Sequence, residues 1–107
     1  MDILKGKDMI GGWFVGDFTP TAYPTKDFEV AYKTHSKGEK WDSHYHKIAT
    51  EINYMIKGEM IISGTHLKEG DIFIIHPNEV ATPEFLTDCG MVVVKVPSVK
   101  GDKYIVE

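Results

Sequence analysis

The chain has a single cysteine and no long apolar run, and each of these absences excludes a class of protein. Cys89 is the only cysteine in 107 residues, so no internal disulfide can form. The longest apolar runs are Ile72 to Ile75 and Met91 to Val94, far short of the roughly 20 residues needed to cross a bilayer as a helix. The N-terminus lacks the apolar core of a signal peptide. We therefore expect a cytoplasmic protein with no membrane partner.

A cluster of positive charge is also missing. The formal net charge is −4, and the twelve basic residues are scattered along the chain. Binding to a phosphate backbone needs a concentrated basic surface, so we expect no nucleic-acid partner. The composition, 42% hydrophobic and 26% charged, is typical of a globular protein. A chain of this length predicts one domain around one modest core.

Short β-type segments recur along the chain, whereas no apolar period of 3.6 residues lasts for three turns. The turn Lys57-Gly58-Glu59 is expected to join two of the strands as a hairpin. About seven short strands separated by regular turns predict an all-β sandwich or barrel. The expected strands are 28–33, where apolar residues alternate at 28, 30 and 32, the stretch holding His44 and His46, and 51–56, 60–62, 65–67, 72–75 and 91–96.

Residues 1–25 differ from the rest because glycines and prolines interrupt several aromatic residues. We predict that this segment is an N-terminal extension and that residues 26–107 form the barrel. The aromatics are Trp13, Phe14, Phe18 and Tyr23. We expect them to cap one end of the barrel or to pack on a partner chain, and the second arrangement would give a homodimer.

His44 and His46 are the most informative residues for function. Residues two apart on a strand point to the same side, so two imidazoles can converge on one point. A carboxylate from the next strand, Glu51, would complete a set of two histidines and one carboxylate. That set suits a divalent transition metal and leaves coordination positions open for substrate. Fe, Mn, Ni and Zn are all compatible with these donors, so the metal identity stays undecided.

The frame Gly38-x5-His44-x-His46-x4-Glu51-x6-Gly58 resembles the first sequence motif of the cupin superfamily at every fixed position. Gly70-Asp71, the apolar strand and the Pro77-Asn78 turn resemble the second motif. The resemblance implies a cupin barrel, a double-stranded β-helix with its site inside, and it implies His44, His46 and Glu51 as metal ligands. Ala81, followed by Thr82, stands where cupins usually carry a fourth ligand, a histidine.

Other residues are candidates for the pocket by their position relative to these three. Asn53 and Met55 share the parity of Glu51, so they are expected to line the pocket beside it. Trp41 precedes the histidines, where it forms a lid or simply packs. The catalytic candidates are His76, which follows the apolar strand, and Tyr54. Tyr54 has the opposite parity to Glu51 and is expected on the other face of that strand.

Three functions are compatible with these features. The leading hypothesis is a metal-dependent enzyme of the oxygenase, isomerase or lyase type, acting on a small polar molecule. A second is a binding module for a sugar or a small acid, without chemistry of its own, which the missing fourth histidine favours. A third is a metal-free sugar-nucleotide epimerase or isomerase, in which a histidine base and a tyrosine acid face each other across the pocket.

Overall fold

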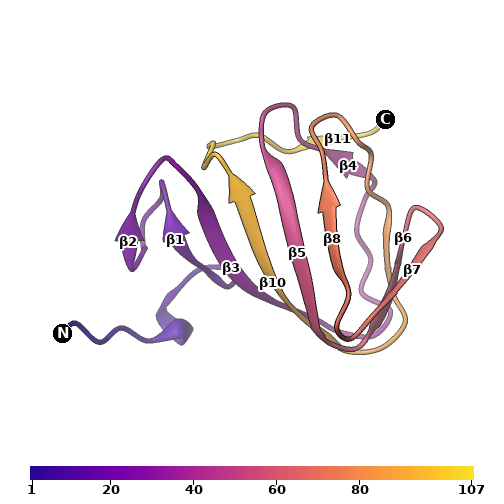
Figure 1. Ribbon diagram of the computed structural model, residues 1–107, viewed down its shortest axis with the longest axis horizontal. Helices are drawn as coiled ribbons and strands as arrows, with labels where there is room; N and C mark the ends of the chain where they lie inside the picture. The colour runs from indigo at the N-terminus through magenta and orange to yellow at the C-terminus, as the bar shows by residue number, and fades with distance from the viewer.

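Eleven strands and one short 3-10 turn make up the computed structural model, which describes all 107 residues (Figure 1). The turn, η1, covers Gly6–Asp8, and no helix is long and apolar enough to span a membrane. The strands are β1 (Trp13–Gly16), β2 (Tyr23–Pro24), β3 (Glu29–His35), β4 (His44–Tyr45), β5 (Thr50–Lys57), β6 (Glu59–Ile62), β7 (Thr65–Lys68), β8 (Ile72–Ile75), β9 (Pro83–Phe85), β10 (Cys89–Val96) and β11 (Tyr104–Ile105).

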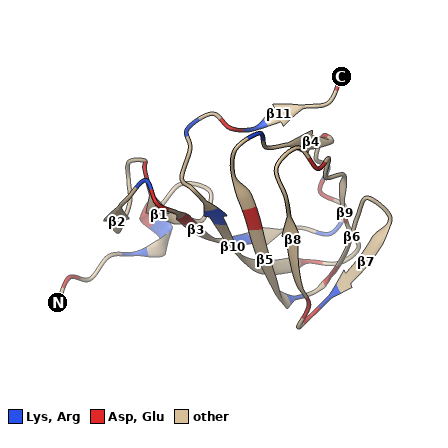
Figure 2. Cartoon of the chain, turned by 45° about the horizontal axis from the view of Figure 1, so that its top comes forward, with Lys and Arg blue, Asp and Glu red and all other residues tan.

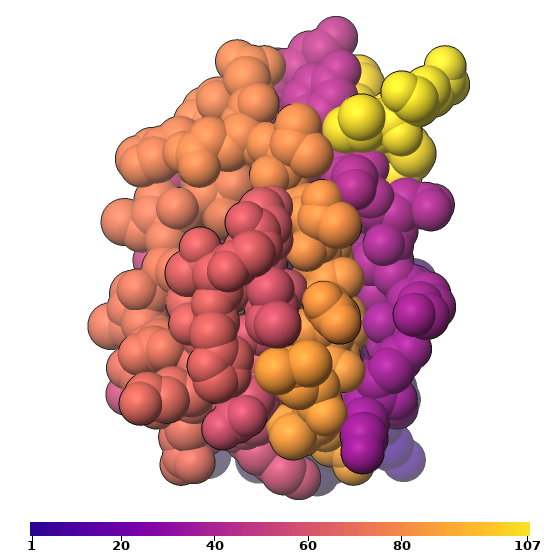
Figure 3. Space-filling view, turned by 90° about the vertical axis from the view of Figure 1, so that its right-hand side faces the viewer, coloured from indigo at the N-terminus to yellow at the C-terminus, as the bar shows by residue number.

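The strands form a large sheet that faces smaller ones. The large sheet has the order β2-β1-β3-β10-β5-β8, a second has the order β7-β6-β9, and β11 pairs with β4. Figure 3 shows the right-hand side of the molecule in Figure 1, where segments around residues 40, 60 and 85 pack side by side and the C-terminal residues lie at one end. The all-β barrel expected from the sequence is confirmed.

One expected pairing is wrong, namely the hairpin across Lys57-Gly58-Glu59. β5 pairs with β10 and β8, whereas β6 pairs with β7 and β9, so the chain changes sheets at Gly58. Gly58 adopts a φ of +89°, which glycine reaches without steric cost. The tight turn after β6 is instead Ser63-Gly64, which has positive φ at both residues and joins β6 to β7.

The core lies between the sheets and is rich in methionine. Met55, Met60 and Met91 are almost fully buried, together with Phe85 and Val93. On β3 the residue that enters the core is Ala31, while its neighbour Tyr32 is 46% exposed. The apolar alternation at 28, 30 and 32 therefore marks the outer face of this strand, and positions 29, 31, 33 and 35 face the interior.

The outer face of the large sheet carries several exposed apolar side chains. They come from β3, β5, β8 and β10 and include Tyr32, Ile52, Tyr54, Ile56, Ile72, Ile74 and Val96. The N-terminal aromatics behave differently from one another. Trp13 enters the sheet on β1, which pairs with β3, and Phe18 packs edge-on against it at 6.5 Å between ring centroids. Phe14 and Tyr23 stay exposed. Homodimer formation remains a prediction.

Candidate functional site

A row of charged side chains crosses the inner face of the large sheet. Lys95 on β10 lies directly opposite Glu29 on β3 and opposite Glu51 on β5. Figure 2 shows the same juxtaposition as a blue segment on β10 beside a red one on β5. In the next inward row, Val93 lies opposite Asn53. Strand pairing therefore places Glu51 and Asn53 on one wall of the interior, and the amide of Asn53 donates a hydrogen bond to Glu51 Oε2 at 3.2 Å.

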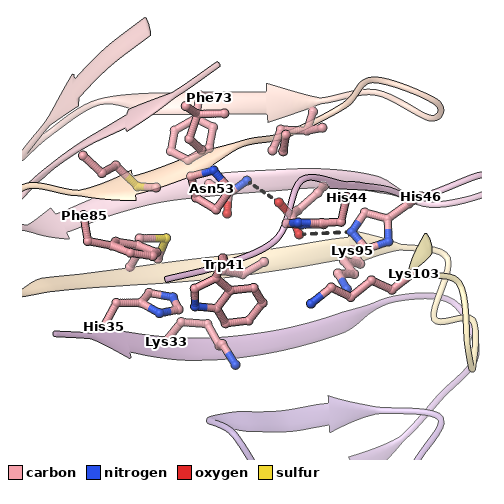
Figure 4. Close-up of a pocket in the computed structure, with 18 of the residues that line it drawn as sticks. Lys33, His35, Trp41, His44, His46, Asn53, Phe73, Phe85, Lys95 and Lys103 are labelled. Carbon is pink, nitrogen blue, oxygen red and sulfur yellow. Dashed lines mark hydrogen bonds and ion pairs between the residues drawn. The ribbon is translucent and has the colours of Figure 1, made fainter. Parts of the chain in front are cut away.

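His44 and His46 reach the same pocket from β4 and the segment that follows it (Figure 4). The backbone of His44 exchanges two hydrogen bonds with Ala81, of 3.0 and 2.8 Å. Ala81 therefore lies beside His44 on the pocket wall, as the spacing of the second motif implies. A side chain longer than a methyl group at residue 81 would extend toward the histidines, but none is present.

Hydrogen bonds fix the orientation of both imidazoles. His44 Nδ1 donates to the carbonyl of Asp42 at 3.1 Å, and His46 Nδ1 donates to the carbonyl of Asp102. A carbonyl oxygen only accepts, so Nδ1 carries the proton in each ring. In the neutral form this leaves the lone pair on Nε2, the arrangement found in histidines that ligate metals. Burial lowers the pKa of His44, which favours that neutral form.

Glu51 supplies a buried negative charge. Its side chain is 14% exposed, and its Oε1 lies 3.7 Å from His46 Nε2. Burial alone would raise the pKa of Glu51. The contact with His46, the charge of the Lys95 ammonium and the hydrogen bond from Asn53 lower it by more, so the pKa lies below its usual range. The carboxylate is therefore ionised near neutral pH. As the side chains stand, no group of three His, Cys, Asp or Glu converges tightly enough to hold an ion.

The pocket encloses about 170 Å³ and is open to solvent at one end. Of the residues expected in it, His44, His46, Glu51, Asn53 and Trp41 all contribute to its wall. The expectation for Met55 is wrong, because this side chain points inward but is fully buried in the core below the pocket. The remaining wall is mainly apolar, with Phe73, Ile75, Met91 and Val93 from the large sheet and Met60, Ile62 and Phe85 from the smaller one.

The two catalytic candidates lie outside the pocket. Tyr54 is 45% exposed on the outer face of β5, as its parity predicts. His76 is exposed after β8, where the inward residue is Ile75, and its backbone N–H donates to Glu79. No tyrosine lines the pocket. The histidine and tyrosine pair that a metal-free epimerase would need is therefore not assembled there.

Four charged or titratable residues of the pocket were missed from the sequence, namely Lys33, His35, Lys95 and Lys103. His35 stacks on Phe85 at 4.2 Å between ring centroids, and its Nδ1 lies 2.6 Å from Glu39. Glu39 also accepts a hydrogen bond of 2.5 Å from Trp41 Nε1. Bonds from Trp41 and His35 lower the pKa of Glu39 to about 2. Position 35 has the parity of Ala31, which is the signal that would have placed His35 inside.

No protein-family model and no curated protein sequence matches the chain. Among solved structures, a conserved protein with a double-stranded β-helix domain from Klebsiella pneumoniae is 29% identical, with a TM-score of 0.69 over 78% of this chain and 73% of that one. An RmlC-like cupin from Shewanella frigidimarina is 19% identical, with a TM-score of 0.63 over 71% of each chain.

A DMSP lyase from Ruegeria pomeroyi is 13% identical, with a TM-score of 0.71 over 86% of this chain. The match covers 48% of the lyase, so the chain spans about half of that enzyme's length. At such low identity the likeness to the lyase and to the Shewanella protein concerns the fold alone. The sheet order and these neighbours agree, and the chain has the double-stranded β-helix fold that is found in cupins.

Proposed function

We propose that this protein is a metal-dependent enzyme acting on a small polar molecule, with a divalent transition metal held by His44, His46 and Glu51. The observation that carries the proposal is the contact between His46 Nε2 and Glu51 Oε1. With its proton on Nδ1, the neutral imidazole presents a lone pair to a carboxylate, and both groups are acceptors. Two buried acceptors that face each other need a cation between them, either a metal ion or a second proton on His46 Nε2, and the proposal takes the first.

The distance of 3.7 Å between these two atoms suits a shared ion. Zinc-type ions bind nitrogen and carboxylate oxygen at about 2.0–2.2 Å, so two ligands of one ion lie roughly 2.8 to 3.7 Å apart for angles between 90° and 120°. The side chains would have to move inward to complete the set, because no three donors converge as they stand. A bound metal would polarise a substrate oxygen or activate a bound water.

Ala81 shapes what the site would accept. Its methyl group lines the pocket where a fourth histidine would occupy a coordination position. A metal held by three protein ligands keeps more open positions, which favours a substrate that chelates through two oxygen atoms. The presence of a lyase among structures with this fold is compatible with such chemistry.

Elemental analysis of untagged protein tests the proposal, with His44→Ala and His46→Ala as the disabling variants. We expect roughly one metal ion per chain in the wild type. Loss of either ligand should weaken metal binding by at least the roughly 10- to 100-fold that removing an outer-sphere partner costs. His66→Ala is the matched control, because His66 lies on β7 with a side chain 54% exposed. Absence of metal after reconstitution with Fe, Mn, Ni and Zn in turn would refute the proposal.

Ala81→His should act in the opposite direction. The new imidazole would arise beside His44, across their paired backbones, and add a fourth donor to the set. We expect tighter metal binding together with weaker binding of any chelating substrate, because one open position is consumed. Competition with a chromophoric chelator measures the metal affinity of both proteins. An Ala81→His protein with unchanged or weaker metal affinity would show that residue 81 does not face the ion.

The second candidate is a binding module without metal. The absence of three convergent donors and the alanine at residue 81 favour it. In that case the cation between His46 and Glu51 is a proton on His46 Nε2, which gives an ion pair. Ligand binding with equal affinity in metal-free and metal-treated protein, with no product in either, would support this candidate over the enzyme.

A further inference from the structure

Three lysines enter the pocket from three separate elements. Lys33 comes from β3, Lys95 from β10, and Lys103 from the segment just before β11. Figure 4 shows Lys95 and Lys103 on the side of His46, and Lys33 near the ring of Trp41. Lys33 and Lys95 are partly buried, whereas Lys103 stands at the open end. Three positively charged side chains thus lie beside the proposed metal site, although metal binding by His44, His46 and Glu51 does not require them.

Two of the three lysines have no carboxylate partner. Lys95 pairs with Glu29 at 3.8 Å. Lys33 Nζ donates to the carbonyl of Gly11 at 2.7 Å, and Lys103 Nζ lies 4.1 Å from the centre of the Trp41 ring. Neither of these contacts supplies a full negative charge. Burial and repulsion from Lys95 and Lys103 lower the pKa of Lys33, and burial and repulsion from Lys95 lower that of Lys103.

Carboxylates act on both lysines from beyond ion-pair distance, Glu39 and Glu51 on Lys33 and Glu51 and Asp42 on Lys103. If Glu51 binds a metal, its charge is taken by the ion, and the positive charge of the pocket grows further. An anionic ligand would restore the balance. Met91, which lies opposite Lys33 in the sheet, and Val93 provide an apolar wall that continues to Phe73 on β8 and suits a short carbon chain. The cavity volume of about 170 Å³ lies below the roughly 300 Å³ at which pockets for drug-sized ligands begin, so the ligand must be small.

We infer that the substrate is a small organic acid, with a carboxylate held by Lys33 and Lys103 and with its carbon chain along the wall formed by Val93 and Phe73. The inference rests on the proposed function in one respect, since the metal would hold the oxygen atoms at the other end of the molecule. Lys95, already paired with Glu29, supports the site through its charge. No element of this assignment depends on which first-row metal is bound.

Isothermal titration calorimetry with a panel of short acids tests the inference. The panel is oxalate, malonate, succinate, glutarate and butanoate, with succinamide as the uncharged counterpart of succinate. Each is titrated into untagged protein treated with a chelator and into protein reloaded with metal. We expect at least one acid to bind, succinamide not to bind, and affinity to fall as salt screens the lysines.

Lys103→Gln and Lys33→Gln should each weaken binding of that acid about 10- to 100-fold, as expected for loss of one charge-assisted hydrogen bond. Lys100→Gln is the matched control, because the Lys100 side chain is 73% exposed and lies outside this pocket. The Lys33 ammonium donates to the carbonyl of Gly11, whereas the Lys103 ammonium donates to no backbone group, so Lys103→Gln keeps the test valid if Lys33→Gln fails to fold. A wild-type melting temperature confirms that Lys103→Gln is folded.

The outcomes separate this inference from the proposed function. Binding of no acid, equal binding of succinamide, or unchanged affinity in Lys103→Gln overturns the inference, even if metal is present at full occupancy. Acid binding to chelator-treated protein that is weakened in Lys103→Gln supports the inference, even if elemental analysis finds no metal and the proposed function fails.

Discussion

Gly58→Ala is expected to lower the free energy of unfolding by about 2 to 5 kcal/mol, combining a left-handed backbone cost with forced overpacking. A Cβ at this position would lie 2.2 Å from the carbonyl oxygen of Asp88 and within 3 Å of side-chain atoms of Thr87 and Cys89. Its φ of +89° adds strain for any residue with a side chain. The nearest of these atoms is a backbone carbonyl oxygen, so no side-chain rotation can relieve the clash.

Gly38→Ala provides the matched comparison within the same motif. Gly38 has a φ of +77°, but no atom lies within 4 Å of the position that a Cβ would take. Only the backbone cost applies, about 1 to 2 kcal/mol. The N–H of Gly38 donates to the carbonyl of Phe85 at 2.9 Å, and alanine retains that bond. The two substitutions therefore separate conformational cost from crowding.

Urea unfolding of the two variants and the wild type measures the difference. Gly58→Ala should unfold at a clearly lower urea concentration than Gly38→Ala, and its loss could consume much of the 5 to 15 kcal/mol typical of a domain. Equal midpoints for the two variants would show that the chain relaxes around residue 58.

Local patterns predicted the parts of the fold that depend on neighbouring residues. Ile72–Ile75, for example, forms the expected strand. The prediction of a hairpin at Gly58 was wrong because a Gly-containing turn has the same sequence pattern whether the next strand stays in the sheet or leaves it. Which sheet β6 joins is decided by distant partners, β7 and β9.

In the candidate site, too, local patterns predicted some features, whereas others depend on distant parts of the chain. The motif spacing predicted that His44, His46 and Glu51 line one pocket, because strand parity fixes the side to which each residue points. Parity does not give depth, and Met55 therefore belongs to the core rather than the pocket. Lys33 was not predicted, since a lysine in a strand is usually solvent-facing. Its inward position follows from that of Ala31, which required knowing the face of β3.

Asp102→Asn is expected to destabilise the fold by about 1 to 3 kcal/mol, because the new amide group would face backbone donors. The Asp102 carboxylate accepts hydrogen bonds from the backbone N–H groups of Lys47, Ile48 and Ala49, at 2.9 to 3.3 Å. These residues form the bend between His46 and β5. The side chain is only 6% exposed, so water cannot readily replace it.

The same substitution should weaken metal binding at the proposed site. The backbone carbonyl of Asp102 accepts the Nδ1 proton of His46, and the carboxylate holds that carbonyl in place. Loss of such outer-sphere support typically costs 10- to 100-fold in metal affinity. Metal titration of the variant measures this effect. Asp71→Asn is the control, because Asp71 accepts one exposed N–H from Lys68 and is remote from both histidines.

The contribution of Asp102 should also depend on pH in a defined direction. Burial alone would raise its pKa, but hydrogen bonds from Ala49, Lys47 and Ile48 outweigh it and hold the pKa below its usual range. A depressed pKa means that the stabilisation is present above the unfolded-state value, near 3.9, and is lost as the pH falls through the lower folded-state value. The stability gap between wild type and Asp102→Asn should therefore narrow between pH 6 and pH 2. A gap that stays constant or widens on acidification would show that the carboxylate charge does not hold the bend that carries His46.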